Sequence, residues 1–179
     1  VLIMSTPTAL PGAGADSAVT PIGFVLSAER LVTIRYAQLP SFDALAETLS
    51  KRGTPPLKGV EVFTDLCEEI VDRIADGLEH LAEELASLSV AAFHNDERPG
   101  HAAAQSNRTM RVQLRQVGRI GDRLSQIRDA LLGLTRILAF TDQFGCDGDD
   151  AAMKARLASL RQDLTSISDY DEHLSNKVQ

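Results

Sequence analysis

Residues 57–93 have the sequence LKGVEVFTDLCEEIVDRIADGLEHLAEELASLSVAAF, and this stretch decides the fold class. Its apolar residues recur every three or four positions, which is the spacing of one face of an amphipathic helix. A single helix over this stretch would be about 50 Å long, well above the average for a globular protein. We therefore expect a protein built on long helices. The apolar face comprises Val60, Phe63, Leu66, Ile70, Ile74, Leu78, Leu81, Leu85 and Leu88.

Two further helical patterns follow, after predicted loops at residues 94–100 and 142–150. Both carry aliphatic residues at heptad spacing, which is typical of helices that pack along one another. The first two helices are expected to form an antiparallel hairpin. The third pattern continues to Gln179 without a stop signal, which favours a chain cut within a helix. The second seam comprises Met110, Val117, Leu124, Leu131 and Leu138, with Ile120, Ile127 and Leu134; the third comprises Met153, Leu157, Leu160, Leu164, Ile167, Asp171, Leu174 and Val178.

The region before the long helices predicts a small sheet. Residues 1–6 form an apolar strand pattern, and residues 21–36 contain two β-branched runs around a turn, which indicates a hairpin. A short helix capped by Ser41 follows and ends near Gly53. The expected fold is α+β: a partial antiparallel sheet of three strands, an α-helical hairpin and one further long helix. We expect a domain boundary between residues 1–55 and 56–179.

Composition narrows the function classes. The net charge is −7 and there is no basic block, so a nucleic-acid partner is not expected. The apolar runs are shorter than the roughly 20 residues that a membrane helix needs. Cys67 and Cys146 have no paired spacing, which fits a reducing compartment. No catalytic residue set or phosphate-binding motif is recognisable, so the protein is not expected to be an enzyme.

Three segments carry a family resemblance: PIGFVLSAERLVTIRY at 21–36, GVEVFTDLCEEIVDRIADGLEHLAEELASLS at 59–89 and HLSNKVQ at 173–179. Together they resemble the cytoplasmic domain of the CorA family of divalent-cation transporters, which includes the ZntB-type zinc transporters. The resemblance implies that the third long helix is a stalk leading to transmembrane helices beyond this chain. It also implies the cytoplasmic side of a bacterial inner membrane, and a homopentamer in the full-length protein, with the fragment alone a monomer or dimer.

The same resemblance suggests where a regulatory cation binds. Carboxylates near the start of the stalk helix sense Mg²⁺ in the CorA branch, and Asp147, Asp149 and Asp150 occupy that region here. Mg²⁺ is the first candidate, with Zn²⁺ and Co²⁺ as alternatives, and two or three carboxylates on facing subunits would suffice. The competing interpretation is that Asp149 and Asp150 only cap the helix.

Asp171 interrupts the third seam, where a charge needs a partner or a bound cation if it is buried. We expect it to face water in a permeation funnel or a symmetry axis, or to lie where the seam has rotated to solvent.

The alternative function is a PhoU-like helical metal-binding or signalling module. It would use an acidic face formed by Glu68, Glu69, Asp72 and Asp76. These acids also suit the solvated side of an amphipathic helix. The predicted hairpin argues against this alternative, because an all-helical bundle has no place for it. The loop residues His94, Asp96, Glu97 and His101 lack a zinc spacing and are interpreted as solvated surface.

Overall fold

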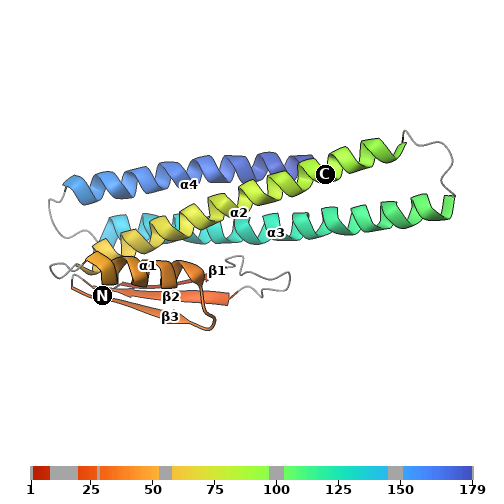
Figure 1. Cartoon of the computed structure of the whole chain (residues 1–179). Coiled ribbons are helices and arrows are strands. Elements are labelled where there is room, and N and C mark those ends of the chain that lie inside the picture. Colours follow the sequence, from red (N-terminus) through yellow and green to blue (C-terminus); the bar gives the residue numbers. More distant parts are fainter. Residues whose placement is uncertain are drawn as a thin grey trace.

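The computed structural model describes residues 2–8, 20–27, 29–52, 58–96, 103–144 and 151–178 (Figure 1). In these ranges a small sheet and a short helix lie at one end of three long helices. The α+β class with an antiparallel sheet is confirmed. The elements are β1 (Leu2–Thr8), β2 (Thr20–Leu26), β3 (Leu31–Arg35), α1 (Pro40–Arg52), α2 (Gly59–Asp96), α3 (Ala103–Phe144) and α4 (Ala151–Val178).

The sheet is antiparallel, with the strands in the order β1-β2-β3. Leu26 of β2 faces Leu31 of β3 at the closed end of the hairpin. The Ser27 N–H donates to the Arg30 carbonyl oxygen at 2.9 Å, and the Arg30 N–H donates to the Ser27 hydroxyl oxygen at 3.1 Å. The Ser27 hydroxyl therefore helps to close a connection that lacks the usual Asn-Gly or Asp-Gly pair.

One face of β2 packs on the first turns of α2. Ile22, Phe24 and Leu26 alternate along the strand and are buried, as the period of two requires. The Phe24 ring meets Phe63 of α2 edge-on, with centroids 5.6 Å apart and planes at 88°, which is a favourable aromatic geometry. This contact joins the sheet to the helical bundle through a continuous core.

Gly59 is where the backbone of α2 meets the hairpin. A Cβ added at this glycine would lie 2.7 Å from the Ser27 carbonyl oxygen and 2.7 Å from the carbonyl carbon and oxygen of Arg30. Backbone atoms cannot move aside as a flexible side chain can. Only glycine permits this close approach, so the residue sets how α2 leaves the sheet.

The three long helices run alternately in opposite directions, and α4 contacts both α2 and α3 (Figure 1). Their predicted apolar seams supply most of the buried core. Among the described residues, no helix has the length and apolar character needed to cross a membrane. The buried positions of α4 are Met153, Leu157, Leu160, Leu164, Asp171 and Leu174.

Several predicted element ends were wrong. The helix α2 continues through His94 to Asp96, and α3 continues to Phe144, because the nearest helix-stopping residues, Pro99 and Gly145, come later in the sequence. The helix α1 begins at Pro40, whose fixed φ suits a first helical position. Ser41 therefore lies inside α1, buried, and its hydroxyl has no hydrogen-bond partner in the described part of the chain. The predicted domain boundary, at residues 55 and 56, lies outside the described residues.

Candidate functional site

The predicted cation ligands Asp147, Asp149 and Asp150 lie in the connection between α3 and α4, outside the described residues. The structure does describe the helix that follows them, which begins at Ala151. No group of three or more His, Cys, Asp or Glu side chains that could hold a metal ion is found within the described ranges. The aspartate site therefore stays a prediction, and the histidines of residues 94–101 lie among side chains that the structure does not describe.

The first turns of α4 are tied to α2 by one arginine. Arg156 donates from Nε to Glu68 Oε1 at 3.1 Å and from Nη2 to Glu68 Oε2 at 2.5 Å. Its Nη2 also donates to Asp65 Oδ1 at 2.7 Å. These hydrogen bonds to Glu68 and Asp65 raise the pKa of Arg156. Such a bidentate guanidinium–carboxylate pair has a defined geometry, so it fixes the start of α4 just after the predicted cation ligands.

A second contact holds the same end of α4. The Thr64 hydroxyl of α2 lies 3.4 Å from the Met153 sulfur of α4 and 2.9 Å from the Val60 carbonyl oxygen. Both Thr64 and Met153 are buried. The position of the helix start is thus determined by packing as well as by charge.

The acidic face proposed for a PhoU-like module is partly used inside the fold. Glu68 pairs with Arg156, and Glu69 pairs with Arg73 one turn away at 3.1 Å. Asp72 remains among like charges: partial burial, and then the charges of Glu69, Asp76 and others nearby, raise its pKa. Two of the four carboxylates therefore act as intramolecular ion-pair partners.

Asp171 lies at the α3–α4 interface, and both earlier expectations for it were wrong. Its side chain is 1% exposed, and its Oδ2 accepts a hydrogen bond from Arg128 Nε at 3.0 Å. The other carboxylate oxygen, Oδ1, is buried without a hydrogen-bond partner in the described structure. Burial raises the pKa of Asp171, and the neighbouring Arg128 acts in the opposite direction. Because α3 covers this side chain, it faces neither solvent nor a symmetry axis.

Sequence reasoning missed both arginines. Arg128 follows the seam residue Ile127, and Arg156 precedes the seam residue Leu157. For Arg128 the available signal was a cation at the edge of one seam together with a carboxylate, Asp171, inside the seam of another helix. It predicts a partner by type but does not say which helix supplies it.

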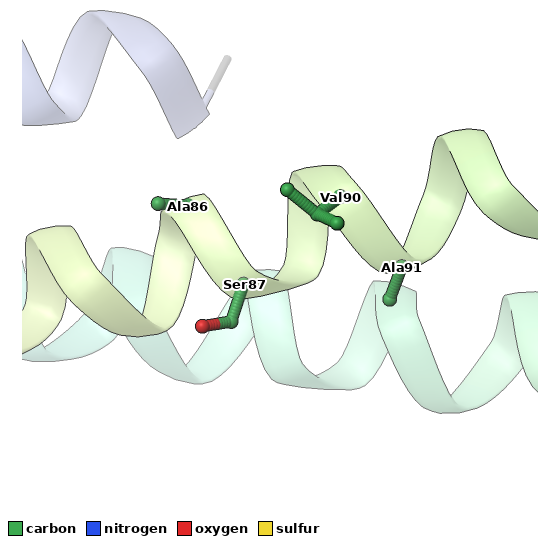
Figure 2. A pocket seen from close by; sticks show the side chains of 4 residues that line it. All are labelled: Ala86, Ser87, Val90 and Ala91. Atoms are coloured by element: carbon green, nitrogen blue, oxygen red, sulfur yellow. The ribbon is translucent and has the colours of Figure 1, made fainter.

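In the described part of the chain, α2 contributes to the lining of two surface hollows. Figure 2 shows the first, formed on successive turns by Ala86, Ser87, Val90 and Ala91; of these four described residues, only Ser87 has a polar side chain. The second is an apolar groove between the three long helices, beside the last turns of α4. Among their described lining residues, neither hollow offers several oxygen ligands to a hard cation. The groove is lined by Ala82, Leu85, Ala86, Leu88, Ser89 and Ala92 of α2, Gln113 and Val117 of α3, and Leu174 and Lys177 of α4.

The sequence matches the family described as CorA-like Mg²⁺ transporter protein over residues 1–178. This chain belongs to the CorA-like family. The resemblance carried by the hairpin, the α2 segment and the end of α4 is therefore confirmed. Members of the family are transporters rather than enzymes. A PhoU-like module is not supported, because the sheet packs on α2 and the CorA-like family match includes the strands of that sheet.

Solved structures show the same fold. The full-length CmaX protein superposes with a TM-score of 0.72 at 18% identity, covering 98% of this chain and 50% of that one. The CorA magnesium transporter from Methanocaldococcus jannaschii superposes with a TM-score of 0.73 at 13% identity, and the match covers 99% of this chain and 51% of that one. The ZntB cytoplasmic domain from Vibrio parahaemolyticus RIMD 2210633 superposes with a TM-score of 0.57 at 14% identity, and the match covers 99% of this chain and 64% of that one. This CorA-like chain thus spans about half the length of the first two. No curated protein matches it.

Proposed function

We propose that this chain is the cytoplasmic regulatory part of a divalent-cation transporter, with Mg²⁺ as the first candidate cargo and Zn²⁺ or Co²⁺ as alternatives. The observation that carries the proposal is the CorA-like family match over residues 1–178. The fold likeness to a magnesium transporter and to a ZntB cytoplasmic domain supports it. In this proposal α4 is the stalk helix that links the regulatory part to the membrane.

The proposal includes an assembly in the membrane. The chain covers only 50% and 51% of two full-length neighbours, which leaves room for transmembrane helices after α4. The apolar groove that Leu174 and Lys177 line together with residues of α2 and α3 offers apolar walls beside the last turns of α4. We place this part on the cytoplasmic side of a bacterial inner membrane, in a homopentamer when full-length and a monomer or dimer when alone.

Regulation in this proposal acts through the start of α4. A cation held by Asp147, Asp149 and Asp150, together with carboxylates of a facing subunit, would offset their mutual repulsion. A ligand shifts an equilibrium only by binding one state better, so the cation would stabilise the closed arrangement. Support comes from the contacts of Arg156 and Met153, because they couple the residues just after these aspartates to α2.

The test is Mg²⁺ binding by calorimetry to the chain in which Asp147, Asp149 and Asp150 are all replaced by Ala. We expect the affinity for Mg²⁺ to fall by about tenfold or more, because the affinity of such a site depends on the number of its charged ligands. The control replaces three exposed carboxylates, Asp122, Asp129 and Asp169, and removes the same charge. It should change the affinity by less than about threefold, because exposed charges act weakly at a distance.

Sedimentation velocity at each protein concentration would identify the species that binds. Equal affinities for the wild type and the triple aspartate variant would refute the site. An equal loss in both triple variants would also refute it, because net charge alone would then explain binding. Neither result would affect membership of the CorA-like family.

A further inference from the structure

Asp171 is the one buried charged residue in the described part of the chain. It belongs to the α4 seam, in which Leu164 and Leu174 are buried as well. Aliphatic surroundings disfavour a charge, because a buried carboxylate loses its hydration. The fold therefore holds an acid where burial favours its neutral form.

The Asp171 carboxylate is incompletely hydrogen-bonded. Arg128 donates from Nε to Oδ2 at 3.0 Å, and the Nη2 of Arg128 lies 3.0 Å from the same oxygen. The second oxygen, Oδ1, is buried and has no hydrogen-bond partner among the described residues. An ionised carboxylate accepts hydrogen bonds through both oxygens, so half of this group lacks the donors that replace water. Protonation removes the charge, and a neutral carboxyl costs much less to bury.

Two charged side chains act on Asp171. Arg128 of α3 favours the carboxylate, and Glu172, the next residue of α4, disfavours it; within the described residues α2 supplies no charge that acts on it. The Arg128 side chain is 47% exposed, whereas that of Asp171 is 1% exposed. Water therefore screens the arginine but cannot reach the carboxylate. Burial outweighs the ion pair, so the pKa of Asp171 is raised above its ordinary value.

We propose that Asp171 is a proton-binding site at the α3–α4 interface. As the pH falls from neutral, the carboxylate takes up a proton from solvent while Arg128 keeps its own charge. The ion pair then becomes a guanidinium beside a neutral carboxyl, held by neutral acceptors such as the Ser175 hydroxyl, which lies 2.9 Å from Arg128 Nη2. A contact between two long helices thus responds to pH. The proton binding does not depend on the proposed function, whereas its consequence for a stalk helix does.

The direction of the pH effect separates this site from an ordinary stabilising ion pair. A carboxyl whose pKa is raised by folding makes the fold more stable as the pH falls through that pKa. The gain is complete once the unfolded chain is protonated as well, near about pH 4. A carboxylate stabilised by its arginine would instead leave stability unchanged down to about pH 4 and lower it below that pH.

The first measurement is urea denaturation of the whole chain from neutral pH to about pH 4, with Asp171→Asn as the reference. Asparagine has nearly the same size and cannot titrate, so the difference between the two chains isolates the carboxyl. We expect the urea midpoint of the wild type to rise relative to that of the variant as the pH falls, by about 0.5 M or more. Asp169→Asn removes an exposed carboxylate of the same helix and should leave that rise in place.

The second measurement follows the carboxyl carbon of Asp171 by NMR, with its signal assigned by its absence from Asp171→Asn. The signal should move to its protonated position at a higher pH than the ordinary aspartate value of about pH 4. Arg128→Met should raise that pH further and Glu172→Gln should lower it, because they remove the opposing and the like charge. The proposal is overturned if the wild type gains no stability relative to Asp171→Asn above about pH 4, or if the signal stays that of a charged carboxylate down to this pH.

Discussion

Arg156→Met is expected to lower the free energy of unfolding and to loosen the start of α4. Methionine keeps most of the aliphatic stem and a good helix propensity, so the change removes mainly the guanidinium. What is lost are the bonds to Asp65 at 2.7 Å and to Glu68 at 2.5 Å. Two carboxylates of α2 would then face each other without the cation that separates them.

The magnitude follows from the exposure of the three groups. The Arg156 and Glu68 side chains are 38% and 39% exposed, whereas that of Asp65 is only 11% exposed. Exposed pairs contribute up to about 1 kcal/mol. Removing one partner of a buried pair costs about 3–5 kcal/mol. This cluster lies between the two cases, and we expect a loss of about 2 kcal/mol.

The assay is urea denaturation followed by circular dichroism, with Arg119→Met as the matched control. Arg119 is an exposed arginine of α3 with no ion pair within the described residues, so its replacement should change stability by less than about 0.5 kcal/mol. A double-mutant cycle with Glu68→Gln should give a coupling of about 1 kcal/mol. Equal losses for Arg156→Met and Arg119→Met, or zero coupling, would refute the assignment of Arg156 as an interhelical clamp.

Two further predictions concern the backbone and the acidic face. Gly59→Ala is expected to cost about 2 kcal/mol or more in urea denaturation, because its Cβ would meet backbone atoms at 2.7 Å. Gly118→Ala, whose Cβ would meet nothing within 4 Å, should instead stabilise the chain by about 0.5–1 kcal/mol; the same sign for both would contradict the argument. Asp72→Asn should raise stability at pH 7, because burial and neighbouring acids raise the pKa of Asp72 in the folded state and so disfavour its charged form. The gain should vanish below about pH 4, where the carboxyl is protonated in both states, and a gain that persists unchanged at pH 3 would be inconsistent with this cause.

Much of the fold could be predicted because its signals are local and periodic. The apolar period of 57–93 specified a long helix, and the heptad seams specified helices that pack lengthwise. The hairpin was predictable from its β-branched runs. Helix ends were less so: α2 passes through His94, because a polar residue permits a helix end without requiring one.

The candidate cation site could be predicted only through family resemblance, and Asp147, Asp149 and Asp150 lie outside the described residues. The contacts that hold the neighbouring helix were not predictable in this way. Asp65 and Glu68 are about 90 positions before Arg156, and no local pattern says which turns of α2 and α4 meet.

Period and motif are properties of consecutive residues, so the helical class, the hairpin, the seams and the membership of a cation-transporter family could be predicted without a structure. The burial and the ion-pair partner of Asp171, in contrast, depend on how the helices pack. The sequence showed a charge within a seam, which is compatible with solvent, a symmetry axis or a partner. The partner is Arg128, 43 positions earlier, and the two meet only because α3 and α4 pack antiparallel at one sliding position. That position is a property of two helices together, and neither helix specifies it alone.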